Sequence, residues 1–205
     1  GLVGSEMCIR DSEHADAVAE GGEERREGAG GGGQQRRREE RALRRARELR
    51  GAAAGAGLSL ALACALSFCL ESAKITTAFS KIGASGDYGG SYFLPRLVGA
   101  AKARELYFTA DVISGKEAYD LGIMTKIAGS NTFDAESKEY AKYLAGLPTV
   151  ALGYMKKNLN AAESSTLSDV FDMEAAHMMR TFMTEDHKAA ALAFVKKEQP
   201  VFGGK

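Results

Sequence analysis

Aromatic side chains divide this chain near residue 50. All nine Phe and seven Tyr residues lie after that point. Residues 1–50 hold eleven arginines and no lysine, whereas residues 51–205 hold three arginines and thirteen lysines. Because a core needs large apolar side chains, only the second part can build one. We therefore predict a disordered or artefactual Arg/Gly/Glu-rich segment over residues 1–50 and one folded domain over residues 51–205.

The first segment has several interpretations. Residues 1–12 resemble a translated sequencing adapter, a kind of segment that is set aside before the fold is considered. Residues 34–50 hold helix formers but only Leu43 and Leu49 as large apolar residues, which favours a solvated helix at best. An RNA-binding basic helix is the alternative, although interleaved glutamates weaken it.

Charge and cysteine content exclude several classes of protein. The formal net charge is zero, so nothing favours a general nucleic-acid or membrane-surface binder. Cys8, Cys64 and Cys69 have unrelated spacings, which predicts neither a disulfide framework nor a metal site. We expect Cys64 and Cys69 to be small buried hydrophobes in a reducing compartment.

Residues 51–70 form a charge-free run that is long enough to span a bilayer. Because arginines precede it, the run also has the pattern of a signal anchor. Its high content of Gly, Ala, Ser and Cys instead favours a helix buried against protein. We predict no membrane partner and keep the anchor as the alternative.

The remaining chain has the pattern of a compact α/β protein. Ser114 and Glu117 fit a capping box at the start of a short helix that stops at Gly122. Strands are predicted at Ile75–Phe79 and Ile123–Ile127, with a glycine-studded loop at Gly83–Gly90. Helices are predicted at residues 92–98, 102–109, 133–146, 149–163, 166–183 and 186–197.

A glycine turn, Gly51–Gly57, leads directly into an apolar helical segment. Such a turn leaves backbone N–H groups without partners at the start of the helix, where they favour a developing negative charge. The alternative is a small-residue turn that only allows close packing. The segment Gly51–Gly57 is not a phosphate loop, because no Gly-Lys-Ser/Thr ending follows.

Asp87 is a carboxylate between Gly86 and Gly89, just before a predicted helix. It could cap that helix. It could also be a general base that lies near the anion-stabilising turn.

The order of these motifs resembles the enoyl-CoA hydratase/isomerase (crotonase) family over residues 51–205. The resemblance is carried by G-A-G-L-S-L-A-L-A-C, E-S-A-K-I-T-T-A-F-S-K-I-G, S-G-D-Y-G-G-S-Y-F-L-P-R-L-V-G, I-S-G-K-E-A-Y-D-L-G-I-M-T-K-I and A-F-V-K-K-E-Q-P-V-F-G-G-K. It implies an α/β fold, a truncated crotonase-like β-β-α superhelix followed by C-terminal oligomerisation helices, and a homo-trimer or hexamer.

The resemblance also implies a chemistry of fatty-acid metabolism. Family members polarise the carbonyl of a coenzyme A thioester, the substrate, between two backbone N–H groups, and no separate cofactor is implied. One donor falls on Ala56, between Gly55 and Gly57. The other normally lies in an Ala/Ser-Gly-rich motif further upstream, which we do not find in this sequence.

Family hydratases carry two glutamates at positions that are Ser59 and Phe79 here. Some family isomerases instead use an aspartate where Asp87 stands, next to Gly86. The resemblance therefore implies enoyl-CoA double-bond isomerisation with Asp87 as acid/base. An atypical hydratase (a lyase) and a catalytically inactive fragment are the alternatives.

Phe194 and Lys197 match positions where the family's last helix contacts bound coenzyme A. For Lys197 the alternative is a solvated helix end. His177 and His187 match no catalytic position, and we expect them on a helix surface or at an interface.

The front of the family pattern differs in this chain. Arg41–Arg50 stands where the family has a buried apolar strand, and Leu66–Leu70 does not follow the family pattern. A frameshifted or chimeric transcript would explain both features. We expect the chain to fold poorly alone and, as a compartment, the cytoplasm, with a mitochondrion or peroxisome as alternatives.

Overall fold

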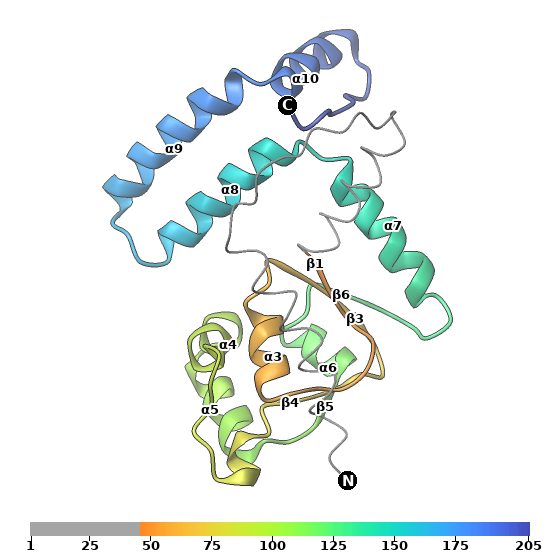
Figure 1. Cartoon of the computed structure of the whole chain (residues 1–205), viewed down its shortest axis with the longest axis vertical. Helices are drawn as coiled ribbons and strands as arrows, with labels where there is room; N and C mark the ends of the chain where they lie inside the picture. The colour runs from red at the N-terminus through yellow and green to blue at the C-terminus, as the bar shows by residue number, and fades with distance from the viewer. Residues whose placement is uncertain (1–45) are drawn as a thin grey trace, which may run out of the picture. The chain divides into compact units, whose positions relative to one another are not determined.

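The computed structural model describes residues 46–205 (Figure 1). It divides into two compact units, the first ending at Glu139 and the second running from Tyr140 to Lys205. Each unit is treated by itself below. The predictions for residues 1–45 lie outside the described part of the chain.

Two small sheets form the frame of the first unit. In one, strand β3 (Leu66–Leu70) lies between β1 (Ala46–Leu49) and β6 (Lys126–Ala128), and both neighbours run parallel to it. In the other, β4 (Lys74–Thr76) lies between β2 (Ala53–Ala54), which is parallel to it, and β5 (Ile113–Ser114), which is antiparallel. The predicted mixture of helix and sheet is confirmed.

Strand β3 is the central strand of its sheet, although we expected this segment to depart from the pattern that the resemblance implies. Phe68 and Cys69 are 2% and 0% exposed, as is usual for a strand flanked on both edges by parallel neighbours. Burial raises the pKa of the Cys69 thiol to about 11. The prediction that this cysteine is a buried hydrophobe is confirmed, whereas Cys64 is only half-buried.

The structure corrects our prediction of a helix over residues 34–50, because Ala46–Leu49 form strand β1. Ala46–Leu49 pairs with Leu66–Cys69, and Leu49 packs against the core. Arg50 forms ion pairs with Glu48 and Asp134 and lies 4.9 Å from the ring centroid of Phe133. Residues 46–50 therefore belong to the fold, because pairing along β3 outweighs the helix propensity of an Arg-rich segment.

Residues 51–70, predicted as one buried helix or an anchor, are three elements. Strand β2 leads into α3 (Ala56–Leu62), which ends before Ala63, and β3 follows. Within residues 46–205, no helix has both the length and the apolar character needed to cross a membrane.

Four further helices belong wholly or partly to the first unit: α4 (Gly90–Val98), α5 (Ala100–Thr109), α6 (Gly115–Asp120) and α7 (Phe133–Ala145), the last of which continues into the second unit. A 3₁₀ helix spans Phe79–Ile82. Helices α3, α4 and α5 lie next to one another (Figure 1). The core between them and the sheets contains fully buried Ile75 and Leu94.

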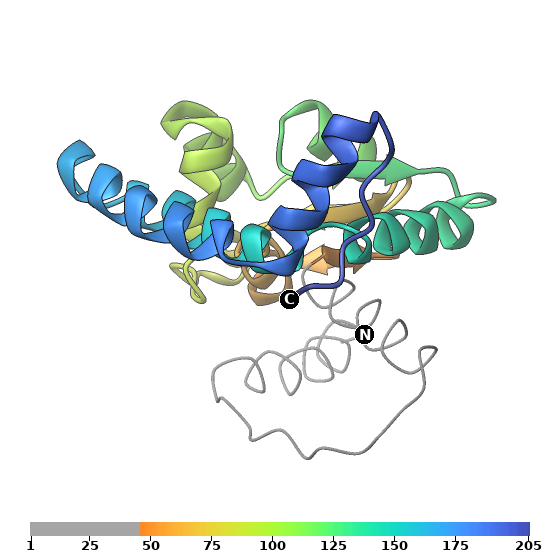
Figure 2. The same ribbon diagram turned by 90° about the horizontal axis from the view of Figure 1, so that it is seen from above.

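The second unit continues with α8 (Thr149–Ala162), α9 (Leu167–Phe182) and α10 (Glu185–Lys196), close to the predicted ranges. The C-terminal tail turns back along α10 (Figure 2). It is held by buried Asp186, whose carboxylate accepts hydrogen bonds from the backbone N–H groups of Gly203 and Gly204. His177 is half-buried between Tyr154 and Asn158, and His187 is exposed.

Candidate functional site

The glycine turn sets the direction in which α3 begins. Gly55 is the N-cap, with φ 53° and ψ −120°, a conformation that only glycine adopts without strain. Its N–H donates to the carbonyl of Thr76 over 3.2 Å, which ties the turn to the end of β4. Ala56 is therefore the first helical residue, and its N–H has no carbonyl partner within the helix.

Tyr107 contacts both Ser59 and Phe79, the two positions where the resemblance places hydratase glutamates. Tyr107, on α5, hydrogen bonds through its hydroxyl with the hydroxyl of Ser59. Its ring stacks on that of Phe79, with centroids 6.3 Å apart. Ser59 is 2% exposed and Phe79 is 8% exposed. A hydroxyl pair and an aromatic pair thus occupy these positions.

Glycines make room for this cluster of Ser59, Phe79 and Tyr107. A Cβ at Gly90 would overlap the hydroxyl oxygens of both Ser59 and Tyr107. A Cβ at Gly86 would lie 3.3 Å from the Tyr107 ring, and one at Gly55 would lie 3.5 Å from the Phe79 ring. The glycine turn and the Asp87 loop therefore pack against the same three side chains.

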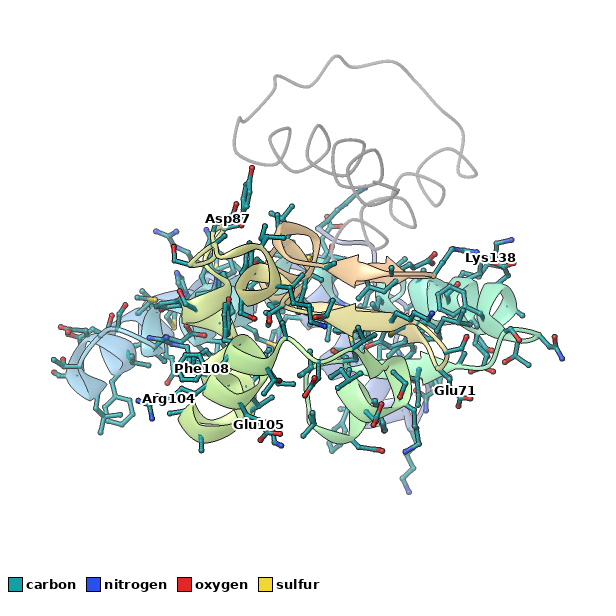
Figure 3. The ribbon with its side chains drawn as sticks, turned by 90° about the horizontal axis from the view of Figure 1, so that it is seen from below. Glu71, Asp87, Arg104, Glu105, Phe108 and Lys138 are labelled. Carbon is teal, nitrogen blue, oxygen red and sulfur yellow. The ribbon has the colours of Figure 1, made fainter. Side chains whose placement is uncertain are left out.

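Asp87 is exposed on the loop between Gly86 and Gly89 (Figure 3). Its carbonyl accepts a hydrogen bond from the N–H of Gly90 over 3.2 Å. The alternative role as a helix cap is wrong, because Gly89 is the N-cap of α4 and no side chain caps that helix. The carboxylate remains available for other roles.

The charge of Asp87 contributes to the pKa of Tyr107. Burial raises this pKa, the hydrogen bond with Ser59 lowers it, and the negative charge of Asp87 raises it, with a net upward change. Tyr107 is therefore protonated at neutral pH.

Phe194 and Lys197 lie in the second unit, at the end of α10. Phe194 is 84% exposed, and Lys197 is the exposed C-cap residue with φ 58°. Gly57 lies in the first turn of α3 and is half-buried. The structure thus brings Ala56, Gly55, Gly57, Gly86 and Asp87 into one unit.

The sequence analysis missed Tyr107. The available signal was spacing: Ala103, Leu106, Tyr107 and Ala110 recur at helical intervals, and all but Tyr107 are buried. A hydroxyl on an otherwise apolar helix face needs a polar partner inside the fold.

Comparisons with known proteins agree with the resemblance. The family model described as Enoyl-CoA hydratase/isomerase matches residues 47–205. The chain is 34% identical over 157 residues to 1,2-epoxyphenylacetyl-CoA isomerase of Escherichia coli (strain K12), covering 77% of this chain and 60% of the relative. It is 30% identical over 151 residues to 4-chlorobenzoyl coenzyme A dehalogenase-1 of Arthrobacter sp, covering 74% and 54%.

The fold comparison gives the same result. The crystal structure of an enoyl-CoA hydratase from Polaromonas sp. JS666 aligns with a TM-score of 0.71 at 28% identity, covering 99% of this chain and 76% of that one. The chain spans about 60% of the length of the isomerase it matches. Since the family model covers most of the sequence, this chain belongs to the enoyl-CoA hydratase/isomerase family.

Proposed function

We propose that the chain is the part of an acyl-CoA-processing enzyme that isomerises the double bond of an enoyl-CoA, with Asp87 as acid/base. Support comes from the family membership and from a relative named as an isomerase of an acyl-CoA. The observation that carries the proposal is the cluster at Ser59, Phe79 and Tyr107. It holds no carboxylate, so the proton carrier next to it is Asp87.

The proposed reaction proceeds through a thioester enolate. The Asp87 carboxylate removes a proton from the α carbon of a β,γ-enoyl-CoA, and the electrons of that C–H bond move onto the thioester oxygen. The N–H of Ala56 donates a hydrogen bond to this oxygen and stabilises its negative charge. Asp87 then returns the proton to the γ carbon, and the double bond becomes α,β.

Hydration is the less favoured reaction. Adding water needs a base for the water and an acid for the α carbon. Ser59 is a neutral hydroxyl that is already hydrogen bonded, and Phe79 has no proton to exchange. A single exposed carboxylate suits a proton that leaves one carbon and returns to another.

The test is an isomerisation assay on a β,γ-enoyl-CoA with the 205-residue chain. Asp87→Asn keeps the size and removes the base, so we expect a loss of about 10²-fold or more in kcat. Asp111→Asn, an exposed aspartate after α5, is the matched control and should keep full activity. Isomerisation retained by Asp87→Asn contradicts the proposal, and so does a wild-type chain that neither binds nor converts the substrate.

We also propose that the second unit mediates a homo-trimer or hexamer. Large apolar side chains are exposed along α8, α9 and α10: Met155, Leu159, Phe171, Met178, Met179, Phe182 and Leu192. An exposed apolar surface of this kind is typical of an association surface. Light scattering should give a trimer or hexamer mass, which Phe171→Glu should reduce. A monomeric wild-type chain contradicts this proposal.

The exposed Phe194 and Lys197 are proposed to contact coenzyme A, with the lysine pairing with a phosphate as a point charge. Lys197→Ala should then weaken binding of free coenzyme A, whereas Lys188→Ala, an exposed lysine of the same helix, should not. Equal affinities for the Lys197 variant and the wild type favour the solvated helix end.

A further inference from the structure

The last residues of the chain lie extended against α10, within the second unit. Burial alternates along residues 200–205: the even-numbered positions are half-buried and the odd-numbered ones are exposed. Such a period of two is typical of an extended segment with one face on a neighbouring element. Figure 2 shows this tail, residues 198–205, turning back along α10. The tail therefore packs on the helix that precedes it.

Asp186, the second residue of α10, holds the far end of the tail. Its carboxylate accepts hydrogen bonds from the backbone N–H groups of Gly203 and Gly204, the latter over 2.9 and 3.1 Å to its two oxygens. Its own backbone N–H donates to the backbone oxygen of Lys205 over 3.2 Å. The residue is only 4% exposed, and a buried carboxylate needs such donors. These four residues form the tail latch.

Lys197 reverses the chain at the other end of the tail. It is the C-cap of α10, with φ 58° and ψ 36°, which is the left-handed conformation. Its N–H donates to the carbonyl of Phe194 over 3.2 Å, and the N–H of Glu198 donates to that of Ala193 over 2.9 Å. A residue with a Cβ is strained in this conformation, which glycine adopts most readily. Such a residue persists where the surrounding structure holds it.

The tail latch provides this hold on Lys197. A helix that continued past Lys197 would lead residues 198–205 away from Asp186, so the latch can close only when the chain reverses at Lys197. Hydrogen bonds to a charged acceptor are stronger than those between neutral groups. The bonds at Asp186 therefore favour the left-handed conformation at Lys197 and offset its strain.

We infer that Asp186 is a positioning residue for Lys197: through the tail latch it keeps Lys197 in the left-handed conformation, so that the lysine is preorganised to pair with a phosphate of coenzyme A. This inference rests on the proposed coenzyme A contact, because it explains how the lysine of that contact is held. A residue that has one conformation before binding loses less conformational entropy when the ligand arrives. Because Asp186 is buried and bonded to the tail, it acts through Lys197 rather than on the ligand.

The first measurement needs no ligand. The HN–Hα coupling constant and the ¹³Cα shift of Lys197, in NMR spectra of the full chain, report its backbone conformation. Asp186→Ala removes both carboxylate oxygens of the latch, so Lys197 should move to the averaged values of a frayed helix end, and the Glu198 N–H should exchange fast. Gly204→Ala should act in the same direction, because Gly204 has φ 73°, where an alanine is strained.

Two matched controls separate the latch from its surroundings. Gly203→Ala adds a methyl group at the adjacent glycine, where the new Cβ would lie an ordinary 3.7 Å from a carboxylate oxygen of Asp186. Glu185→Ala removes the exposed carboxylate that precedes Asp186 in the first turn of α10. Both variants should leave the Lys197 values unchanged.

Two results overturn the inference. One is a left-handed Lys197 in Asp186→Ala; if that variant does not fold, the same result in Gly204→Ala has this meaning. The other is an equal effect of Glu185→Ala, because the charge at the helix end, and not the latch, would then be responsible.

A double-variant cycle with free coenzyme A tests whether Asp186 acts through Lys197. In the wild-type background, Asp186→Ala should weaken the binding of coenzyme A about two- to tenfold, the range expected when one ordered side chain becomes free. In the Lys197→Ala background it should cause no further loss. A merely structural role of Asp186 would weaken binding equally in both backgrounds, and this result contradicts the inference. Isothermal titration calorimetry measures the four affinities.

Failure of the proposed contact and failure of this inference are distinguishable. Wild-type affinity in Lys197→Ala contradicts the proposed contact, and the NMR measurement then still decides whether Asp186 holds Lys197. Weaker binding by Lys197→Ala, with a left-handed Lys197 in both Asp186→Ala and Gly204→Ala, supports the contact and contradicts the inference.

Discussion

The rings of Phe79 and Tyr107 lie nearly parallel, with 6° between their planes and 6.3 Å between their centroids. Phe79 follows the glycine turn after α3, β3 and β4, and Tyr107 follows the Asp87 loop after α4. Their contact therefore fixes the two candidate elements of the site relative to each other within the first unit.

Removing the Phe79 ring should destabilise the first unit. Phe79 is 8% exposed, so Phe79→Ala should lower the free energy of unfolding by about 3–5 kcal/mol. Phe108→Ala, at a residue that is 75% exposed, should change it by less than about 0.5 kcal/mol. Urea unfolding monitored by circular dichroism compares the two, and equal losses would mean that Phe79 is not a core residue.

Adding a methyl group at Gly90 should also be costly. The new Cβ would overlap the hydroxyls of Ser59 and Tyr107, so Gly90→Ala should destabilise the protein by about 1–3 kcal/mol. Gly153→Ala, in the middle of α8 with open space around it, should instead stabilise it by about 0.5–1 kcal/mol. Thermal unfolding measures both, and a stabilising Gly90→Ala would refute the contact.

Acid should weaken the capping box of α6. Glu117 accepts hydrogen bonds from the backbone and side chain of Ser114, and both lower its pKa from the ordinary value of 4.5. A lowered pKa adds stability above the unfolded-state pKa, and this stability is lost as the pH falls through the folded-state value. The stability difference between wild type and Glu117→Gln should therefore shrink from pH 7 toward acid pH.

The control is Glu139→Gln, which removes an exposed carboxylate outside the capping box and is measured over the same pH range. If the Glu117→Gln difference stays constant across the acid range, the carboxylate contributes nothing to the cap.

The tail is expected to depend on Asp186, which is 4% exposed and holds the N–H groups of Gly203 and Gly204. Hydrogen bonds to a charged acceptor are worth about 1.5–3 kcal/mol, so Asp186→Ala should release the tail. Hydrogen exchange at residues 203–205 should become fast in this variant but not in Asp172→Ala, at an exposed aspartate of α9. Unchanged protection would mean that other contacts hold the tail.

Sequence patterns predicted the helices of the second unit well, because apolar spacing and caps such as Thr166 and Thr184 mark them locally. They failed for β1 and β3, where partners distant in sequence override an Arg-rich or atypical segment. Asp87 and Ala56 were visible as motifs. The Tyr107–Ser59 pair was not, because contact between residues of two helices that are 48 positions apart depends on tertiary packing.

The central claim is that Asp87 moves a proton at the α carbon of a coenzyme A thioester. The most direct measurement is deuterium incorporation at the γ carbon of the product when the chain is incubated with a β,γ-enoyl-CoA in D₂O, because the exposed Asp87 carboxyl exchanges the proton taken from the α carbon with solvent before it returns one to the γ carbon. The account predicts incorporation by the wild type and by Asp111→Asn and none by Asp87→Asn. Incorporation at the wild-type rate in Asp87→Asn would contradict it.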